Sequence, residues 1–265
     1  MTDPTPTDPS SPERRDPLAW FGSGRGGAVA VAVAVVALGF SVAPYATGGD
    51  FGSKVRAYLM ANPAVLDEVV QAREQAEATN TVEKINAAVA ANPALMAPDP
   101  RDPSFGPADA KVTVVEFFDF RCPGCKAVAK DYVALMQAHP DVRFVFKDWP
   151  ILDRGDDTSS NYAARAALAA HQQGRYLQVY QALMAENALT REAVDRILAE
   201  NGVTMPEARQ AIGSPEMNRH LADIHTTGAT LGLVGTPTFL INGRTTSSIA
   251  PAEVLAAIEA AKAAA

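Results

Sequence analysis

The hydrophobic and polar residues divide the chain into segments of different character. Residues 1–27 are rich in Pro, Ser, Thr, Asp and Gly, so they predict a disordered tail. Residues 28–46 are uncharged and alternate alanine with valine, a pattern that a β-strand would also produce. Their length is close to the ~20 residues that cross a bilayer, and Arg14, Arg15 and Arg25 precede them. We therefore expect a transmembrane segment at residues 28–46.

The flanks of that segment indicate whether it is retained. A cleaved signal peptide has a short basic region before the apolar run and small residues at the cleavage site. Here the preceding region is long, and Pro44 would follow the most suitable cleavage site, Ala43. These features favour an anchor over a cleaved signal, with residues 1–27 as a cytoplasmic tail.

Residues 51–97 show helical periodicity, with apolar side chains on one side and charged residues elsewhere. Asn62-Pro63 and Asn92-Pro93 each have the composition of a helix start, where asparagine caps free amides and proline occupies the first turn. Such a helix is seldom stable alone in water. The segment therefore forms either a helical extension through which copies of the chain associate, or a solvated spacer.

The next segments predict an α/β domain. Residues 98–110 carry many prolines and predict a linker, after which the domain begins. Residues 111–120, KVTVVEFFDF, are apolar and rich in β-branched and aromatic side chains, as in a buried strand. Residues 122–139 change to helical spacing, and residues 141–149 predict a second strand. Strand, helix and strand in this order predict a βαβ unit.

The only two cysteines of the chain, Cys122 and Cys125, lie at the turn between the first strand and the helix. A helix N-terminus offers unpaired amides and the positive end of the helix dipole, which lower the pKa of a thiol, and Arg121 adds positive charge. We therefore expect Cys122 to be the reactive thiolate and Cys125, one turn further into the helix, to be the resolving cysteine. Pro123 suits the first turn, where its missing amide is not needed.

Other uses of the cysteine pair have less support. A structural zinc site requires about four ligands, and the chain adds only four scattered histidines, so we expect no metal site. An inert disulfide across so short a loop would restrain the unfolded chain little. Two thiolates also suit Cu(I), which leaves a copper-binding protein as an alternative. The net charge of -7 argues against a nucleic-acid partner.

The C-terminal half contains a second group of signals. Helical segments with glycine and proline breaks fill residues 151–222. Further on, GLVGTPTFLINGR contains a short strand at residues 238–241 and the dipeptide Asn242-Gly243, which is typical of a hairpin turn. A last helix is expected to start near Pro251.

A CxxC at a strand-to-helix turn, a GTP loop, a hairpin and a final helix resemble the thioredoxin superfamily, and within it the DsbA family of disulfide oxidoreductases. The resemblance implies a thioredoxin fold formed by residues 107–150 and 223–265. Residues 151–222 match the helical domain that DsbA-type proteins insert into this fold. In the family, the residue that matches Pro237 is cis and lies with Thr236 beside the cysteines, where a substrate strand binds.

The resemblance also assigns roles to individual residues. DsbA-type proteins carry an acidic residue six positions before the first cysteine and a lysine on the next strand, which here match Glu116 and Lys147. The resemblance implies that this pair handles the proton of Cys125, although the two charges could instead merely neutralise each other. Pro123 and Gly124, between the cysteines, join Thr236 and Pro237 as expected substrate contacts.

Three features depart from typical DsbA. Gly124 replaces the usual histidine that stabilises the thiolate, so the direction of electron flow stays open. Thr236 replaces the usual valine, and this threonine resembles isomerases and the ScsC-type copper-sensitivity suppressors. The helical extension at residues 51–97 also resembles ScsC-type proteins, some of which oligomerise through it.

These observations predict a thiol-disulfide oxidoreductase, an oxidase or isomerase, with a redox disulfide between Cys122 and Cys125 and no cofactor. Its expected place is the bacterial inner membrane, with the catalytic domain in the periplasm, because disulfide exchange requires an oxidising compartment. The expected partners are proteins with cysteines, a membrane redox partner that recycles the site, and further copies of the chain bound through residues 51–97. Alternatives are a copper-resistance thiol protein, a reductant of a partner protein, or a tether that acts through its helices.

Overall fold

The computed structural model of the chain describes residues 31–38 and 49–265. The chain divides into two compact units, Met1–Arg73 and Glu74–Ala265. The first unit contains a helix at residues 31–38, helix α2 (Gly49–Ala61) and the beginning of helix α3 (Ala64–Ala91). The second unit contains the rest of α3 and all the elements that follow it.

The predicted transmembrane segment at residues 28–46 is described only in part. Residues 31–38 form a helix with exposed side chains, whereas the rest of the segment and the predicted tail, residues 1–27, lie outside the described residues. Within the described ranges, no helix combines the length and the apolar character needed to cross a membrane. The anchor therefore stays a prediction.

The Glu74–Ala265 unit is built on a mixed five-stranded sheet with the strand order β1-β3-β2-β4-β5. Strands β2 and β3 pair in parallel, whereas β1, β4 and β5 each pair antiparallel with a neighbour. The strands are β1 (Ser104–Phe105), β2 (Thr113–Phe118), β3 (Arg143–Asp148), β4 (Thr238–Ile241) and β5 (Arg244–Thr245). Because helix α4 connects β2 to β3, the predicted βαβ unit is confirmed.

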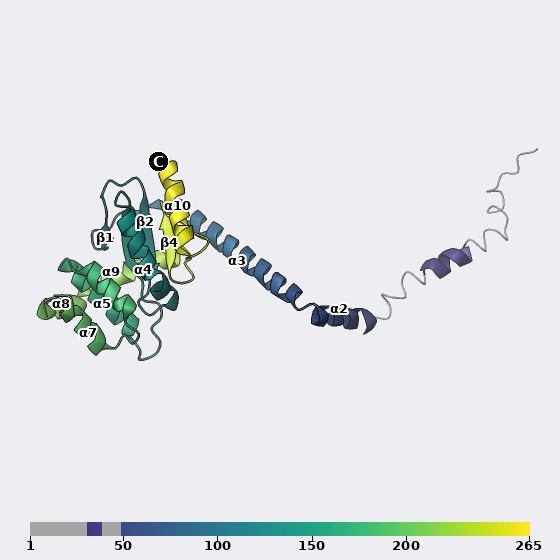
Figure 1. The fold of residues 1–265 in the computed structure, drawn as a ribbon, viewed down its shortest axis with the longest axis horizontal. Coiled ribbons are helices and arrows are strands. Elements are labelled where there is room, and N and C mark those ends of the chain that lie inside the picture. Colours follow the sequence, from purple (N-terminus) through teal and green to yellow (C-terminus); the bar gives the residue numbers. More distant parts are fainter. Residues whose placement is uncertain (1–30, 39–48) are drawn as a thin grey trace, which may run out of the picture. The chain divides into compact units, whose positions relative to one another are not determined.

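Seven α-helices follow the first β-strands of this unit, and a 3₁₀ turn, η1 (Pro93–Met96), precedes them. Helices α5, α7 and α8 lie together beyond one part of the sheet, and α10 lies beside β4 (Figure 1). The helices are α4 (Pro123–Ala138), α5 (Ser159–Gln172), α6 (Tyr176–Ala185), α7 (Arg191–Glu200), α8 (Met205–Ile212), α9 (Pro215–Thr230) and α10 (Pro251–Ala263).

Two hydrophobic clusters cover the two faces of the sheet. On one face, Phe118, Phe146 and Phe239 pack in a cluster with residues of α4, α10 and the helices α5 to α8. On the other face, Phe117 and Leu240 pack with α9 and the end of α3. Successive residues of β2 enter different clusters because side chains alternate across a strand. Both faces are covered, which explains the almost continuous apolar run of β2.

The helical insertion between β3 and the rest of the fold is shorter than predicted. The predicted range, residues 151–222, includes the beginning of α9. However, α9 packs on the sheet through Leu221 and Ile224, so it belongs with the sheet and not with the insertion. The insertion therefore consists of α5 to α8 and ends near Ile212.

Residues 98–110 contain the edge strand β1 of the sheet and are not a free linker. Strand β1 pairs antiparallel with β3, and the carbonyl oxygen of Pro103 accepts a hydrogen bond from the amide of Phe146 at 2.9 Å. Asp102 is buried. The prolines that predicted a linker flank an edge strand, where a missing amide does not interrupt the sheet.

The end of α3 is also part of the globular unit. Ile85 and Val89 are buried in the second cluster, and Oδ1 of Asn86 accepts a hydrogen bond from the backbone amide of Thr245 at 2.9 Å. This bond satisfies a polar group of the edge strand β5. The predicted extension at residues 51–97 is therefore divided within α3, and only its N-terminal part lies in the first unit.

Helix α3 begins at Ala64, directly after Asn62-Pro63, so this predicted helix start is confirmed, but both asparagines bond to the helix before them. Nδ2 of Asn62 donates to the carbonyl of Tyr58 at 2.9 Å, and Nδ2 of Asn92 donates to the carbonyl of Ala88 at 3.0 Å. Each asparagine therefore satisfies a carbonyl group at the end of the helix before it. Only the 3₁₀ turn η1 follows Asn92, which makes no side-chain cap there. The predicted capping of a following helix by Asn92 was wrong.

A buried carboxylate holds the loop between β2 and α4. Oδ1 of Asp119 accepts hydrogen bonds from the amide of Arg121 at 2.7 Å and from Oγ of Ser160 at 2.8 Å. Its Oδ2 accepts from the amides of Ile151 at 2.9 Å and Leu152 at 3.0 Å. One side chain thus joins the loop before the cysteines to the segment after β3 and to the start of α5.

Replacement of Asp119 by alanine is expected to destabilise the protein by about 3 kcal/mol, because it leaves several buried donors without an acceptor. Urea unfolding measures this loss. The control is Asp157→Ala, since Asp157 is an exposed carboxylate near the same loop, and this variant should unfold close to the wild type. Equal losses in the two variants would contradict the role assigned to Asp119.

Candidate active site

The two cysteines lie at the N-terminus of α4. Cys122 is the N-cap residue, Pro123 opens the helix, and Cys125 lies in its first turn. Both cysteines are free thiols in this structure. Cys122 is 8% exposed and Cys125 is 0% exposed, so the first sulfur is the more accessible one, in the order that the sequence predicts.

The surroundings of Cys122 favour its thiolate. Its pKa falls from 9.0 to about 5, first because the Cys125 thiol donates a hydrogen bond to it, against the opposing effect of burial. A hydrogen bond from the Thr236 side chain and the backbone amides of Cys125 and Gly124 lower the pKa further. The carbonyl oxygen of Thr236 also lies 3.0 Å from Sγ of Cys122, where it accepts from the protonated thiol. The low pKa therefore arises without the histidine that typical DsbA proteins have.

Cys125 has the opposite tendency. Burial raises the pKa of its thiol, and donation of its hydrogen bond to Cys122 and the negative charge of Glu116 raise it further. At neutral pH the pair therefore consists of one thiolate and one thiol. This is the ionisation state that the reactive and resolving roles require.

Arg121 does not contribute in the way predicted from its position beside Cys122. Its guanidinium forms an ion pair with Asp157 at 2.8 Å and donates to the carbonyl of Leu152 at 3.1 Å. The main groups that lower the pKa of Cys122 are Cys125, Thr236 and the amide of Gly124. The amides of α4 and the neighbouring thiol supply the stabilisation instead.

The loop that carries Thr236 and Pro237 lies against the CPGC turn. The Thr236–Pro237 peptide bond is cis, as the resemblance implied. The structure gives a steric reason for glycine at position 124. A Cβ there would lie 3.3 Å from Cδ of Pro237 and 3.4 Å from Cδ1 of Ile249, which is closer than usual. Glycine thus allows the two loops to approach closely, and a larger residue would require them to move apart.

Glu116 is completely buried on the face of the sheet that α4 covers. Its Oε2 accepts a hydrogen bond from the hydroxyl of Tyr180 at 3.4 Å, and no partner is found for its Oε1 in the described part of the chain. Burial raises its pKa well above the usual value, and the charge of Asp148 adds to this effect. A protonated carboxyl near Cys125 can serve as a proton donor.

Lys147 does not pair with Glu116. In the parallel register Glu116 lies opposite Phe146, so Glu116 and Lys147 point to opposite faces of the sheet. The ammonium group of Lys147 instead forms a buried ion pair with Asp102, and Nε2 of His220 lies 3.4 Å from the other oxygen of that carboxylate. The structure therefore does not bring the two predicted partners together.

Asp148, which follows Lys147, shares the face of Glu116. Its Oδ2 accepts a hydrogen bond from the hydroxyl of Tyr176 at 2.8 Å, and burial raises its pKa well above the usual value. Tyr176 and Tyr180 come from α6 of the insertion. Asp148 and these two tyrosines were not identified from the sequence. The only signal in the sequence was that Asp148, an acidic residue, lies at the end of a predicted strand.

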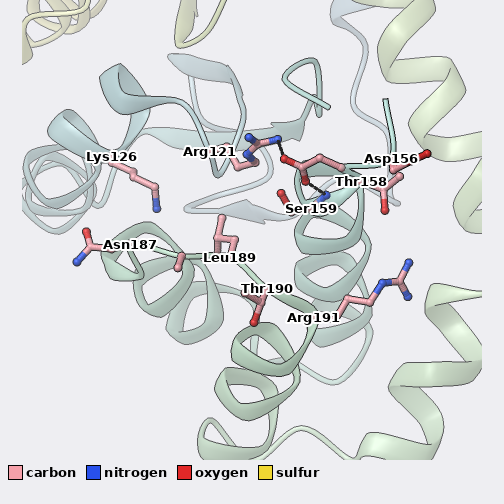
Figure 2. A pocket seen from close by; sticks show the side chains of 11 residues that line it. Arg121, Lys126, Asp156, Thr158, Ser159, Asn187, Leu189, Thr190 and Arg191 are labelled. Atoms are coloured by element: carbon pink, nitrogen blue, oxygen red, sulfur yellow. Dashed lines mark hydrogen bonds and ion pairs between the residues drawn. The ribbon is translucent and has the colours of Figure 1, made fainter. Parts of the chain in front are cut away.

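A charged cleft of about 600 Å³ adjoins the cysteine turn on the side of the insertion. Figure 2 shows the side chains of Arg121, Lys126 and Arg191 around it. Lys126 donates to three backbone carbonyls, one of them that of Glu186 at 2.7 Å, so it caps the end of α6. In residues 31–38 and 49–265, no group of three or more His, Cys, Asp or Glu side chains is placed to hold a metal ion.

Comparisons with known proteins agree with this geometry. Residues 99–260 match the family described as thioredoxin, and residues 50–78 match the family described as the copper resistance protein ScsC N-terminal domain. Among curated relatives, the Na(+)/H(+) antiporters NhaA 3 of Salinispora tropica and NhaA 1 of Salinispora arenicola are each 35% identical over 161 residues, 57% of this chain. The chain spans only 23% of the length of either antiporter.

Solved structures are similar over most of their length. A thioredoxin-like oxidoreductase from Silicibacter pomeroyi DSS-3 is 36% identical with a TM-score of 0.58, over 63% of this chain and 95% of that one. A ScsC variant from Proteus mirabilis is 20% identical with a TM-score of 0.61, over 83% and 97%. The thiol-disulfide exchange protein alpha-DsbA2 from Wolbachia pipientis is 21% identical with a TM-score of 0.61, over 72% and 98%. The last two show the fold alone.

The thioredoxin match covers more than half of the chain and includes the sheet, the CPGC turn and the cis-proline loop. The protein therefore belongs to the thioredoxin family, and its structural relatives are thiol-disulfide oxidoreductases of the DsbA and ScsC types.

Proposed function

We propose that the protein is a thiol-disulfide oxidoreductase that exchanges disulfides with cysteines of other proteins. The observation that carries the proposal is the geometry of the CPGC turn: Cys122 caps α4 beside the cis Thr236–Pro237 bond, and Cys125 is buried one turn into the helix. The lowered pKa of Cys122 and the raised pKa of Cys125 agree with it. The similarity to the thioredoxin-like oxidoreductase from Silicibacter pomeroyi DSS-3 and to the thiol-disulfide exchange protein from Wolbachia pipientis supports it.

In the oxidising direction, a substrate thiolate attacks Sγ of Cys122 in the Cys122–Cys125 disulfide. The S–S bond breaks, a mixed disulfide forms, and Cys125 leaves as a thiolate that takes up a proton. A second substrate thiolate then attacks the substrate sulfur of the mixed disulfide and releases Cys122 as a thiolate. Two electrons pass from the substrate to the protein, and no cofactor takes part. In the reverse direction, Cys125 attacks Cys122 and resolves the mixed disulfide.

Glu116 supplies the proton for Cys125 in this proposal. Its buried carboxyl has a raised pKa and so keeps its proton, and once that proton has left, its charge raises the pKa of Cys125 and favours the thiol. Lys147 has no direct part, because it lies on the other face of the sheet with Asp102. Thr236 and Pro237 act on the substrate side, with Pro123 and Gly124 completing the surface around the thiolate.

The stabilised thiolate favours oxidase or isomerase activity over a reducing role. A low pKa of Cys122 stabilises the reduced form of the protein, so its disulfide is a better oxidant. A membrane redox partner would then recycle the site. We therefore propose that the catalytic domain lies in the periplasm, where disulfides persist, with residues 28–46 as the anchor in the inner membrane.

Self-association through the N-terminal helices is the second part of the proposal. The helices α2 and α3 expose an unusual number of large apolar side chains: Phe51, Val55, Tyr58, Met60, Leu66, Val69 and Val70. All seven lie in the region that matches the ScsC N-terminal domain. Exposed apolar side chains in such number indicate an interaction surface and not a solvated spacer. Copies of the chain would bury these side chains against one another.

Replacement of Cys125 by serine is expected to trap the mixed disulfide, because the resolving thiol is absent. After reaction of the reduced variant with a protein that contains disulfides, a covalent adduct should accumulate on non-reducing gels. Cys122→Ser should form no such adduct, since its remaining thiol is buried and protonated. Equal adduct formation in both variants would exclude Cys122 as the attacking sulfur.

The stability of the reduced protein relative to Cys122→Ser is expected to depend on pH. The folded-state pKa of Cys122 is lowered from 9.0 to about 5, so ionisation favours the folded state. This contribution is complete above pH of about 9, decreases as the pH falls, and is lost below about 5. Urea unfolding of both reduced proteins across this range measures it. A constant difference would show that the thiolate is not stabilised.

Replacement of Val70 by glutamate is expected to weaken self-association, because it places a charge among the exposed apolar side chains of α3. Light scattering of the protein without residues 1–48 gives the mass in solution. The control is Gln71→Glu, which introduces the same charge at the next position and should leave the mass unchanged. A monomeric wild type, or the same loss in both variants, would exclude this interface.

A further inference from the structure

A second groove adjoins the cysteine turn, and unlike the charged cleft it is lined by uncharged residues. This groove has a volume of about 360 Å³ and is lined by the cis-proline loop, residues 234–239, and by residues 245–249. Helix α3 forms its remaining wall through Ala78, Thr81, Val82 and Ile85. All the described residues that line the groove are apolar, are glycine, or carry a hydroxyl group.

The groove begins where the reactive sulfur lies. Thr236 and Pro237 line it, and the carbonyl oxygen of Thr236 lies 3.0 Å from Sγ of Cys122. Ile249 also lines the groove, and its Cδ1 would lie 3.4 Å from a Cβ at position 124, between the two cysteines. A polypeptide joined to Cys122 through a mixed disulfide therefore has this groove directly beside its point of attachment.

The wall formed by α3 is held in place by the globular unit. Ile85 is 4% exposed and packs in the second hydrophobic cluster, and Asn86 binds the amide of Thr245. A Cβ at Gly243 would lie 3.0 Å from Cγ1 of Val89, so the helix also lies close to the hairpin turn. The groove is thus preformed, which reduces the entropy lost when a chain binds.

Charge distinguishes the two hollows around the active site. The cleft beside the insertion contains Arg121, Lys126, Asp156 and Arg191 (Figure 2). The groove beside α3 offers no charged partner among its described lining residues. A charged side chain that entered this groove would lose water without gaining an ion pair.

We propose that α3 is a specificity-determining wall of the substrate site. It selects extended polypeptide segments in which the residues on one side of the reactive cysteine, either the N-terminal or the C-terminal side, are uncharged. The inference rests on the proposed thiol-disulfide exchange and adds the class of substrate. Helix α3, which begins in the N-terminal extension, thereby takes part in substrate choice. Thr81 and Val82 contact the bound chain, and Ala78 lies where the groove meets solvent.

The test uses the full-length protein in its disulfide form and peptides that contain two cysteines. Each peptide carries alanine, lysine or glutamate next to the attacking cysteine, on its N-terminal or its C-terminal side. Each reaction converts a peptide dithiol and the protein disulfide into a peptide disulfide and the protein dithiol. On one side of the cysteine, both charged peptides are expected to react about fivefold more slowly than the alanine peptide.

Two alanines of α3 provide matched variants. Ala78 lines the groove, whereas Ala87 is exposed and lies nearly half a helical turn around from that face. Ala78→Glu should speed the lysine peptide and slow the glutamate peptide, each about two- to fivefold and less in high salt. Ala87→Glu should retain the preference of the wild type.

Reaction of the reduced protein with glutathione disulfide separates the two proposals. The wild type and both variants should react at similar rates, since so small a disulfide does not extend along α3. Equal rates for all peptides with the wild type, or the same change in both variants, would overturn the role of α3 alone. Failure of the wild type to react with glutathione disulfide would overturn the proposed function, and the inference with it.

Discussion

The active site depends on the hydrogen bond between two sulfur atoms at the start of one helix. Cys125 donates to Cys122, while amides of α4 add further stabilisation to the first sulfur and burial disfavours charge on the second. The helix N-terminus must therefore be held in a fixed position. Asp119 achieves this with four hydrogen bonds: one within the cysteine loop, two from the segment after β3 and one from Ser160 at the start of α5. The inserted helices thus support the site as well as enlarging the domain.

The alternation of side chains across the sheet places Lys147 and Asp148, which are neighbours in the sequence, on opposite faces of the sheet. Glu116 and Asp148 lie on the face of the cysteines and meet tyrosines of α6. Lys147 and Asp102 lie on the opposite face. Because successive side chains of a strand point to opposite faces, the neighbouring residues Lys147 and Asp148 of β3 contact different groups. In our proposal, the proton for Cys125 therefore comes from the carboxyl group of Glu116 and not from Lys147.

Helix α3 links the two units of the chain in function. Its N-terminal part exposes apolar residues such as Val69 and Val70, which suits association between copies. Its C-terminal part is buried against the thioredoxin core at Ile85 and Val89 and forms one wall of the groove beside the cis-proline loop. A single helix thus combines assembly with substrate selection in our proposals.

The sequence alone determined the βαβ unit, the hairpin turn and the location of the cysteines, because these depend on local periodicity and on the conformational preferences of neighbouring residues. The tertiary structure decided which side chains meet. The strand register separates Lys147 from Glu116, Arg121 turns to Asp157, and the prolines before β1 belong to the sheet edge. Such contacts join residues far apart in the chain, and their energies depend on burial, which a linear pattern does not contain.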